Sequence, residues 1–165
     1  MTSPTRTESS FVTARTVLVM LATLAVAPAS LLAERPDVTA RIVDGRLSPG
    51  EKGPVFVELR LGPKWHVNGH TPLEEFLVPT DVTLTTSSGQ RLRVKYPEGE
   101  LKRFAFSDKP LSVYAGVVRF EAELLAPPDS RGPVALSGEV SYQACTDEQC
   151  FPPARIPLRA SVEIR

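Results

Sequence analysis

The two cysteines of this chain, Cys145 and Cys150, are separated by only four residues. Two thiols this close in sequence can form a structural disulfide, supply two ligands to a metal ion, or exchange a disulfide bond with a partner protein. A predicted strand, 139–144, precedes them, and a second one leads to Leu158. We therefore expect the pair at the neck of a hairpin, where two Cα atoms can approach the roughly 5.5–6 Å that a disulfide prefers.

A structural disulfide is the usual role of two cysteines in an exported protein. The ring closed here would contain about six residues, for which the chain-entropy model gives about 2 kcal/mol, against about 4.7 kcal/mol for a loop of about 100 residues. The short spacing favours a local, reversible bond without excluding a structural one. The residues alone leave these two interpretations open.

A metal site is a second interpretation, because His66 and His70 could join the two cysteines as soft or borderline ligands. The histidines are four positions apart, and on a loop or strand this spacing does not bring them to one side. Zinc sites also tend to use closer cysteine pairs. We therefore expect neither a metal ion nor a cofactor.

The third interpretation is a dithiol that exchanges with partner proteins. Asp147 and Glu148 lie between the cysteines, and nearby carboxylates raise the pKa of a thiol because they disfavour the thiolate. This composition suits a weakly nucleophilic pair, which one partner reduces and which then reduces another disulfide.

The cysteines must be positioned by the rest of the chain, in which apolar residues recur at every second position. This period of two is typical of strands with one buried face. This alternation predicts strands at 38–43, 55–61, 82–86, 92–96, 111–114, 118–124, 134–142 and 160–164. Roughly seven to nine short strands separated by turn residues predict an all-β, immunoglobulin-like antiparallel β-sandwich. The segments 64–72 and 101–110 interrupt the alternation, and we expect them to be functional loops.

The N-terminus has the order of regions of a secretory signal peptide. Arg6 and Arg15 precede an apolar run, 16–27, and an A-x-A site follows at 27–29. The run is shorter than the about 20 residues of a good spanning helix, so we expect cleavage rather than an uncleaved anchor. The prediction is a signal peptide at 1–29 and one domain at 30–165, exported to an oxidising compartment. The absence of net formal charge argues against binding to nucleic acid or to an anionic membrane surface.

Several motifs resemble the N-terminal periplasmic domain of DsbD-type thiol:disulfide interchange proteins. The stretch 142–153, YQACTDEQCFPP, is similar to the active-site hairpin of that family. The segments 64–68 (KWHVN) and 76–80 (FLVPT) resemble its WH(I/V)N and (F/L)xxPT motifs, and 96–99 (YPEG) and 111–116 (LSVYAG) are similar to its middle section. Together these segments extend the resemblance over most of the chain from Val38 to Ile164.

The resemblance implies an immunoglobulin-like sandwich in which Cys145 and Cys150 are the redox pair. It also implies a cap loop at 101–109 whose aromatic side chain covers the disulfide, with Phe106 as the first choice for the cap and Phe104 as the second. The other residues that it places beside the site, where they would shape it, are Trp65, His66, Asn68 and Tyr142.

The chain departs from the family pattern just before the proposed cap residue. Some members have acidic residues there, where this chain has Arg103, Phe104 and Ala105. Asp147 and Glu148 are then the candidates to manage protons at the site. The family analogy favours Cys145 as the cysteine held in a mixed disulfide, and it leaves the nucleophile and the resolving thiol unassigned.

The function implied by the resemblance is that of a periplasmic protein-disulfide reductase or electron-transfer module. In the family, a membrane-embedded thiol reductase donates electrons to the cysteine pair. Thioredoxin-like or other disulfide-bonded periplasmic proteins accept them, in disulfide isomerisation or cytochrome c maturation. The sequence ends at Arg165 without the membrane channel and thioredoxin-like domain of full-length members, so we expect a free-standing, unanchored domain with a separate donor. The alternative is a non-catalytic β-sandwich interaction domain whose disulfide is only structural.

Overall fold

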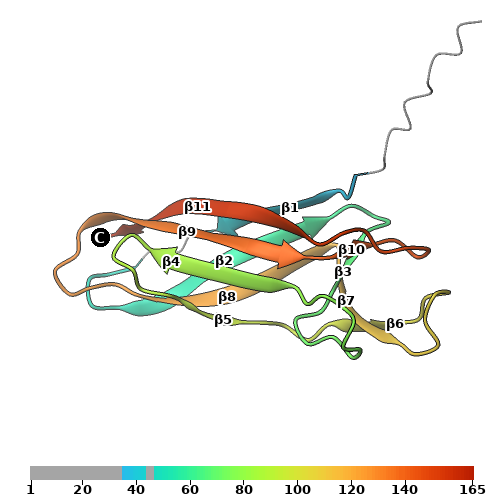
Figure 1. Ribbon diagram of the computed structural model, residues 1–165. Helices are drawn as coiled ribbons and strands as arrows, with labels where there is room; N and C mark the ends of the chain where they lie inside the picture. Colours follow the sequence, from blue (N-terminus) through green and yellow to red (C-terminus); the bar gives the residue numbers. More distant parts are fainter. Residues whose placement is uncertain (1–34, 44–46) are drawn as a thin grey trace, which may run out of the picture. The chain divides into compact units, whose positions relative to one another are not determined.

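The computed structural model describes residues 35–43 and 47–165. These residues contain eleven strands, joined by loops and turns, and no helix (Figure 1). The strands are β1 (Val38–Val43), β2 (Lys52–Leu61), β3 (His66–Asn68), β4 (Asp81–Thr86), β5 (Arg93–Lys95), β6 (Glu100–Lys102), β7 (Leu111–Ala115), β8 (Val117–Leu125), β9 (Gly132–Tyr142), β10 (Ala144–Cys145) and β11 (Ala154–Ile164). These residues include no helix long and apolar enough to cross a membrane. The predicted signal peptide, 1–29, lies outside the described residues.

Two antiparallel sheets pack face to face. Sheet A has the strand order β1-β2-β8-β5, and sheet B has the order β11-β9-β4. The period-two alternation faces inward as predicted: Val57 of β2, Phe120 of β8, Val140 of β9 and Val162 of β11 are fully buried in one hydrophobic core. Burial of this apolar area, at about 25 cal/mol per Å², is the main stabilising contribution. The prediction of an all-β, immunoglobulin-like antiparallel sandwich is confirmed.

A third sheet, sheet C, carries the cysteine hairpin at the end of the sandwich away from the C-terminus (Figure 1). Its strand order is β10-β3-β7-β6. Sheet C continues both layers, because β7 runs into β8 of sheet A through Gly116, and β10 follows β9 of sheet B after Gln143. Gly116 has a φ of 64°, which L side chains rarely adopt, and its carbonyl accepts a hydrogen bond from Leu61 N at 2.8 Å. The hairpin is therefore anchored in both layers.

Three strands of sheet C correct the sequence prediction. The expected loop 64–72 contains β3, the expected loop 101–110 begins with β6, and the expected strand 139–144 is divided at Gln143 into β9 and β10. β3 is buried at all of its positions and β6 is exposed at all of its positions. Neither strand therefore shows the alternation from which strands can be predicted.

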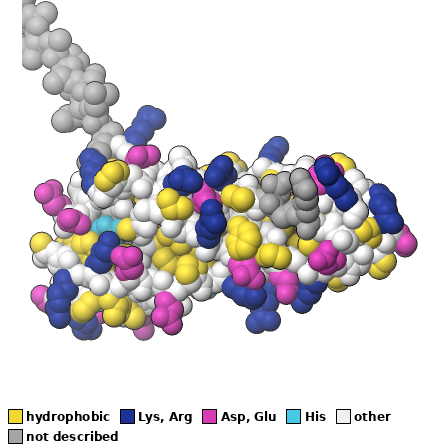
Figure 2. All heavy atoms as spheres, turned by 180° about the vertical axis from the view of Figure 1, so that it is seen from behind, with side chains coloured by type: hydrophobic (Ala, Val, Ile, Leu, Met, Phe, Trp, Pro, Cys, Tyr) yellow, Lys and Arg dark blue, Asp and Glu magenta, His cyan; other side chains and the backbone are white. Residues whose placement is uncertain are grey.

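One carboxylate on sheet A is completely covered by arginine side chains. The Glu58 side chain is 0% exposed, and it accepts hydrogen bonds from Arg41 Nη2 at 2.9 Å, Arg60 Nε at 2.8 Å and Arg119 Nε at 3.1 Å. The strand register places Arg41 on β1 and Arg119 on β8 directly opposite Glu58. These bonds, that from Arg41 first, lower the pKa of Glu58 to about 2. Elsewhere, acidic and basic side chains are interspersed over the face seen in Figure 2.

Candidate redox site

Cys145 and Cys150 form a disulfide, and their Cα atoms are 4.0 Å apart. As the spacing predicts, the two residues face each other across an antiparallel bridge at the neck of a hairpin, and their Cα atoms are closer than the roughly 5.5–6 Å expected from the sequence. Two backbone hydrogen bonds flank the pair, from Thr146 N to Gln149 O at 2.8 Å and from Phe151 N to Ala144 O at 2.8 Å. The hairpin is thus closed by its backbone on both sides of the disulfide.

The two halves of the disulfide differ in exposure. Cys145 is 1% exposed, because it belongs to β10 and is covered on sheet C. Cys150 is exposed and follows the exposed residues 147–149 of the turn. Of the two cysteines, Cys150 is therefore the residue that is open to solvent.

His66 is the direct cross-strand partner of Cys145. Paired side chains in an antiparallel ladder point to the same face, with Cβ atoms about 4.5–5.5 Å apart. The imidazole is 4% exposed and stacks on the ring of Phe104, with centroids 4.2 Å apart. Burial lowers the pKa of His66 to about 4, and Lys102 acts in the same direction, whereas the carboxylate of Asp147 opposes the shift. The imidazole is therefore neutral at neutral pH.

The predicted cap loop folds over this face of sheet C, and Phe104 is its inner residue. Phe104 is 8% exposed and packs in a small cluster with Leu77, Leu111 and Val113. Phe106 stacks on Phe104 at 5.3 Å between centroids, and it remains 42% exposed. The loop is also held by Lys109 Nζ, which lies 2.9 Å from Glu74 Oε1. Phe104 is thus the aromatic residue in contact with the cross-strand partner of Cys145.

A chain of side-chain amides holds the segment that follows Cys150. Gln143 Nε2 donates to the carbonyl of Phe151 at 3.2 Å, and Asn68 Nδ2 donates to Gln143 Oε1 at 3.3 Å and to Val78 O at 2.9 Å. Asn68 is 1% exposed, so its amide is shielded from water. These bonds fix the backbone next to Cys150, and we call Asn68 and Gln143 the amide clamp.

The turn between the cysteines presents acidic side chains to solvent. Asp147 and Glu148 are exposed, and Thr146 Oγ1 accepts hydrogen bonds from Glu148 N at 3.4 Å and Gln149 N at 3.3 Å. Together with Lys64 the turn lines a small cavity of about 320 Å³. Of the two predicted carboxylates, Asp147 is the one that acts on His66.

The residues predicted to shape the site have different surroundings. His66 and Asn68 lie in β3 beside the cysteine hairpin. Trp65 is buried and makes an edge-to-face contact with Phe151, at 5.1 Å between centroids. Tyr142 is buried in the main core, where burial raises the pKa of its hydroxyl. Both residues belong to the main core, and Trp65 also contacts the segment that follows Cys150 through Phe151.

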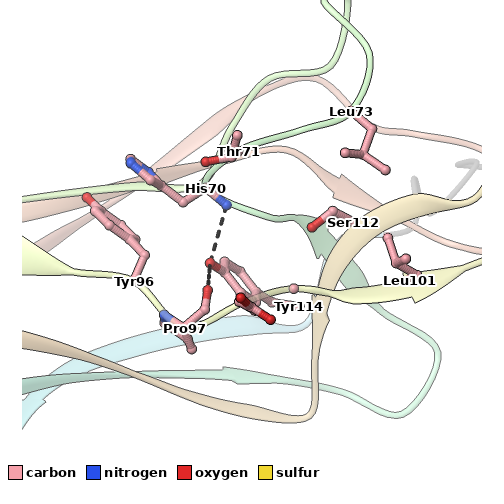
Figure 3. A pocket seen from close by; sticks show the side chains of 10 residues that line it. His70, Thr71, Leu73, Tyr96, Pro97, Leu101, Ser112 and Tyr114 are labelled. Carbon is pink, nitrogen blue, oxygen red and sulfur yellow. Dashed lines mark hydrogen bonds between the residues drawn. The ribbon is translucent and has the colours of Figure 1, made fainter.

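His70 lies in a separate cavity of about 600 Å³ (Figure 3). Its ring stacks on Tyr96 at 3.4 Å, and its backbone N–H donates to the hydroxyl of Tyr114 at 3.3 Å, which in turn donates to Pro97 O at 2.7 Å. The structure gives His66 and His70 different neighbours. Among the described residues, no three or more His, Cys, Asp or Glu side chains gather as a group that could hold a metal ion.

Two residues of the site, Gln143 and Phe151, were not singled out from the sequence. Gln143 interrupts a strand, and Phe151 follows the second cysteine. The only signal was their position beside the cysteine pair, because hydrogen bonds between segments far apart in sequence leave no local pattern. The structure adds both residues to the site.

We compared the chain with curated proteins and with solved structures. No curated protein matches it. Among solved structures, the reduced DsbD N-terminal domain of Neisseria meningitidis is 17% identical, with a TM-score of 0.44, over 66% of this chain and 77% of that one. The N-terminal periplasmic domain of ScsB from Proteus mirabilis is 21% identical, with a TM-score of 0.49, over 74% of this chain and 43% of that one.

A family model gives the decisive match. The model of the N-terminal domain of thiol:disulfide interchange protein DsbD matches residues 34–157, which include the whole of sheet C and both cysteines. The resemblance noted in the sequence motifs is thereby confirmed. The chain belongs to the family of the DsbD N-terminal domain.

Proposed function

We propose that this protein is a periplasmic thiol:disulfide exchange module that passes reducing equivalents through Cys145 and Cys150 to partner proteins. Family membership supports thiol:disulfide exchange, and the disulfide supplies the reacting group. The module would take electrons from a membrane-embedded thiol reductase and pass them to thioredoxin-like or other disulfide-bonded proteins, in disulfide isomerisation or cytochrome c maturation.

The observation that carries the proposal is that the disulfide closes a hairpin already closed by its backbone. Hydrogen bonds flank the cysteines on both sides, and the bond joins neighbouring segments rather than sheets A and B. A disulfide at this place adds little order to the fold. The half-exposed position of the bond suits a link that opens and re-forms.

The difference in exposure supports an order of attack for the two cysteines within this proposal. In the reduced protein, the thiolate of the exposed Cys150 attacks one sulfur of the partner disulfide, and the partner's other sulfur leaves with the electron pair. The buried Cys145 then attacks Cys150, which re-forms the internal disulfide and releases the partner as a dithiol. This order is the reverse of the one that the family analogy favoured, because Cys145 is 1% exposed and out of a partner's reach.

The reduction potential of the pair tests the exchange function. We expect a value in the range of redox carriers, above the roughly −300 mV below which structural disulfides lie. Equilibration with a dithiothreitol redox buffer, followed by gel-shift alkylation, measures it. A potential below that limit supports instead the alternative of an interaction domain with a structural disulfide.

Single-cysteine variants test the roles of the two sulfurs. Cys145→Ser retains the exposed thiol and is expected to accumulate mixed disulfides with disulfide-bonded proteins. Cys150→Ser, the matched control, retains only the buried thiol and should accumulate few. The opposite pattern would reverse the assignment, and the absence of mixed disulfides in both variants would argue for a structural disulfide.

A further inference from the structure

The imidazole of His66 belongs to the residue of β3 that pairs directly with Cys145. It lies on the same face of sheet C as the buried sulfur, 4% exposed and covered by Phe104. Its ring contact among the described residues is the stack on Phe104. No buried side-chain nitrogen or oxygen of these residues lacks a hydrogen-bond partner, so what calls for a chemical explanation is the place of the imidazole opposite a reacting sulfur.

The exchange reaction needs a base at this place. After Cys150 has formed a mixed disulfide, Cys145 must lose its thiol proton before it can attack. Burial disfavours the thiolate and so raises the pKa of such a thiol. Water has little access to a residue that is 1% exposed.

We propose that His66 is the general base that takes the proton of Cys145 in the resolving step. The Cys145 S–H bond breaks and its proton moves to an imidazole nitrogen. The sulfur then attacks Cys150, the mixed disulfide breaks, and the partner sulfur leaves with the electron pair. The proton passes from the imidazolium to solvent or to the leaving sulfur. This inference rests on the proposed exchange function.

The groups around His66 fit this cycle. Phe104 of the cap loop covers the ring, Asp147 of the turn favours the imidazolium, and Lys102 of β6 disfavours it. Because burial lowers the pKa of His66 to about 4 in the disulfide form, the ring gives up its proton once the internal disulfide has re-formed. The base is then neutral and ready for the next turnover.

A two-step release assay separates the proposed roles. The reduced protein is mixed with an aromatic disulfide reagent that liberates a coloured thiolate at each step. The first release, in which Cys150 attacks the reagent, depends on reagent concentration. The second release, in which Cys145 resolves the mixed disulfide, does not. Cys145→Ser should abolish the second release alone.

His66→Phe keeps an aromatic ring under Phe104 but has no basic nitrogen. We expect it to slow the second release by about 100-fold, at the low end of general-base effects, and to leave the first release unchanged. The rate of the second release should then rise in proportion to hydroxide concentration. The control His70→Phe should match the wild type in both steps. A second release from His66→Phe at the wild-type rate overturns the proposal.

A measurement on the unsubstituted ring covers the case in which His66→Phe does not fold. In the reduced wild-type protein, the ring carbon resonances of His66 should follow the ionisation of Cys145 at alkaline pH, and Cys145→Ser should remove this response. Resonances of His66 that do not follow it overturn the proposal. A wild-type protein that releases no coloured thiolate at all contradicts the exchange function itself, which separates the two failures.

Discussion

The ring of Phe104 lies on the ring of His66, with centroids 4.2 Å apart and planes inclined by 17°. Phe104 belongs to the cap loop after β6, and His66 is the cross-strand partner of Cys145. This one contact therefore joins the proposed cap loop to the strand that pairs with the buried cysteine. A movement of the loop that lifts Phe104 would uncover His66.

The first prediction concerns which phenylalanine acts as the cap. Phe104→Ala should speed the reaction of the disulfide with small thiols, and it should lower the free energy of unfolding by about 3 kcal/mol because Phe104 is buried. Phe106→Ala, the matched control, should change stability by less than about 1 kcal/mol because Phe106 is 42% exposed. Stopped-flow reduction by dithiothreitol measures the rates. A larger acceleration in Phe106→Ala would restore the cap choice made from the sequence.

The second prediction concerns the amide clamp. Asn68→Ala removes a buried amide and leaves the half-buried carbonyl of Val78 without its donor, and it should cost about 2 kcal/mol in urea unfolding. Gln143→Ala frees the carbonyl of Phe151, so it should cost less, about 1 kcal/mol, and should speed reduction of the disulfide. The control Gln149→Ala changes an exposed side chain of the turn. Equal reduction rates in Gln143→Ala and Gln149→Ala would show that the clamp does not position Cys150.

The third prediction concerns acid stability through His66. Its pKa in the folded protein is lowered from 6.5 to about 4 by burial, so the unfolded chain binds the proton first as the pH falls. The contribution of neutral His66 to the free energy of unfolding is fully present above pH 6.5 and is lost as the pH falls towards 4. The free energy of unfolding should change there by at most about 1.4 kcal/mol per pH unit through this group. Urea unfolding at a series of pH values should show this slope in the wild type and in His70→Phe, but not in His66→Phe. An unchanged slope in His66→Phe would mean that the imidazole is not held neutral.

The fourth prediction concerns Glu58. Its pKa is lowered from 4.5 to about 2, chiefly by Arg41, so its contribution to stability is present above pH 4.5 and is lost as the pH falls towards 2. Glu58→Gln should lower the urea midpoint at pH 7 and should remove this part of the acid dependence. Glu121→Gln, which removes an exposed partner of Lys95, is the control and should change little. Equal effects of the two substitutions would contradict a special role for the arginine-covered carboxylate.

The sequence by itself determined the main strands of the sandwich. Residues such as Val57 and Phe120 alternate with polar neighbours, and this period of two depends only on the local geometry of a strand with one buried face. The cysteine spacing predicted a pair at the neck of a hairpin and favoured a local bond without excluding other roles. The motif resemblance added the expectation of a redox role and of a cap loop.

Only the tertiary structure decided how the site is arranged. That Cys145 is buried and Cys150 exposed follows from the pairing of β10 with β3, a contact between segments far apart in the chain. The order of Phe104 and Phe106 in the cap depends on the cluster around Leu111, and the amide clamp depends on β3 lying beside the hairpin. These arrangements depend on packing and hydrogen bonds between segments far apart in the chain. Such contacts leave no periodic signal in the sequence of the residues that form them.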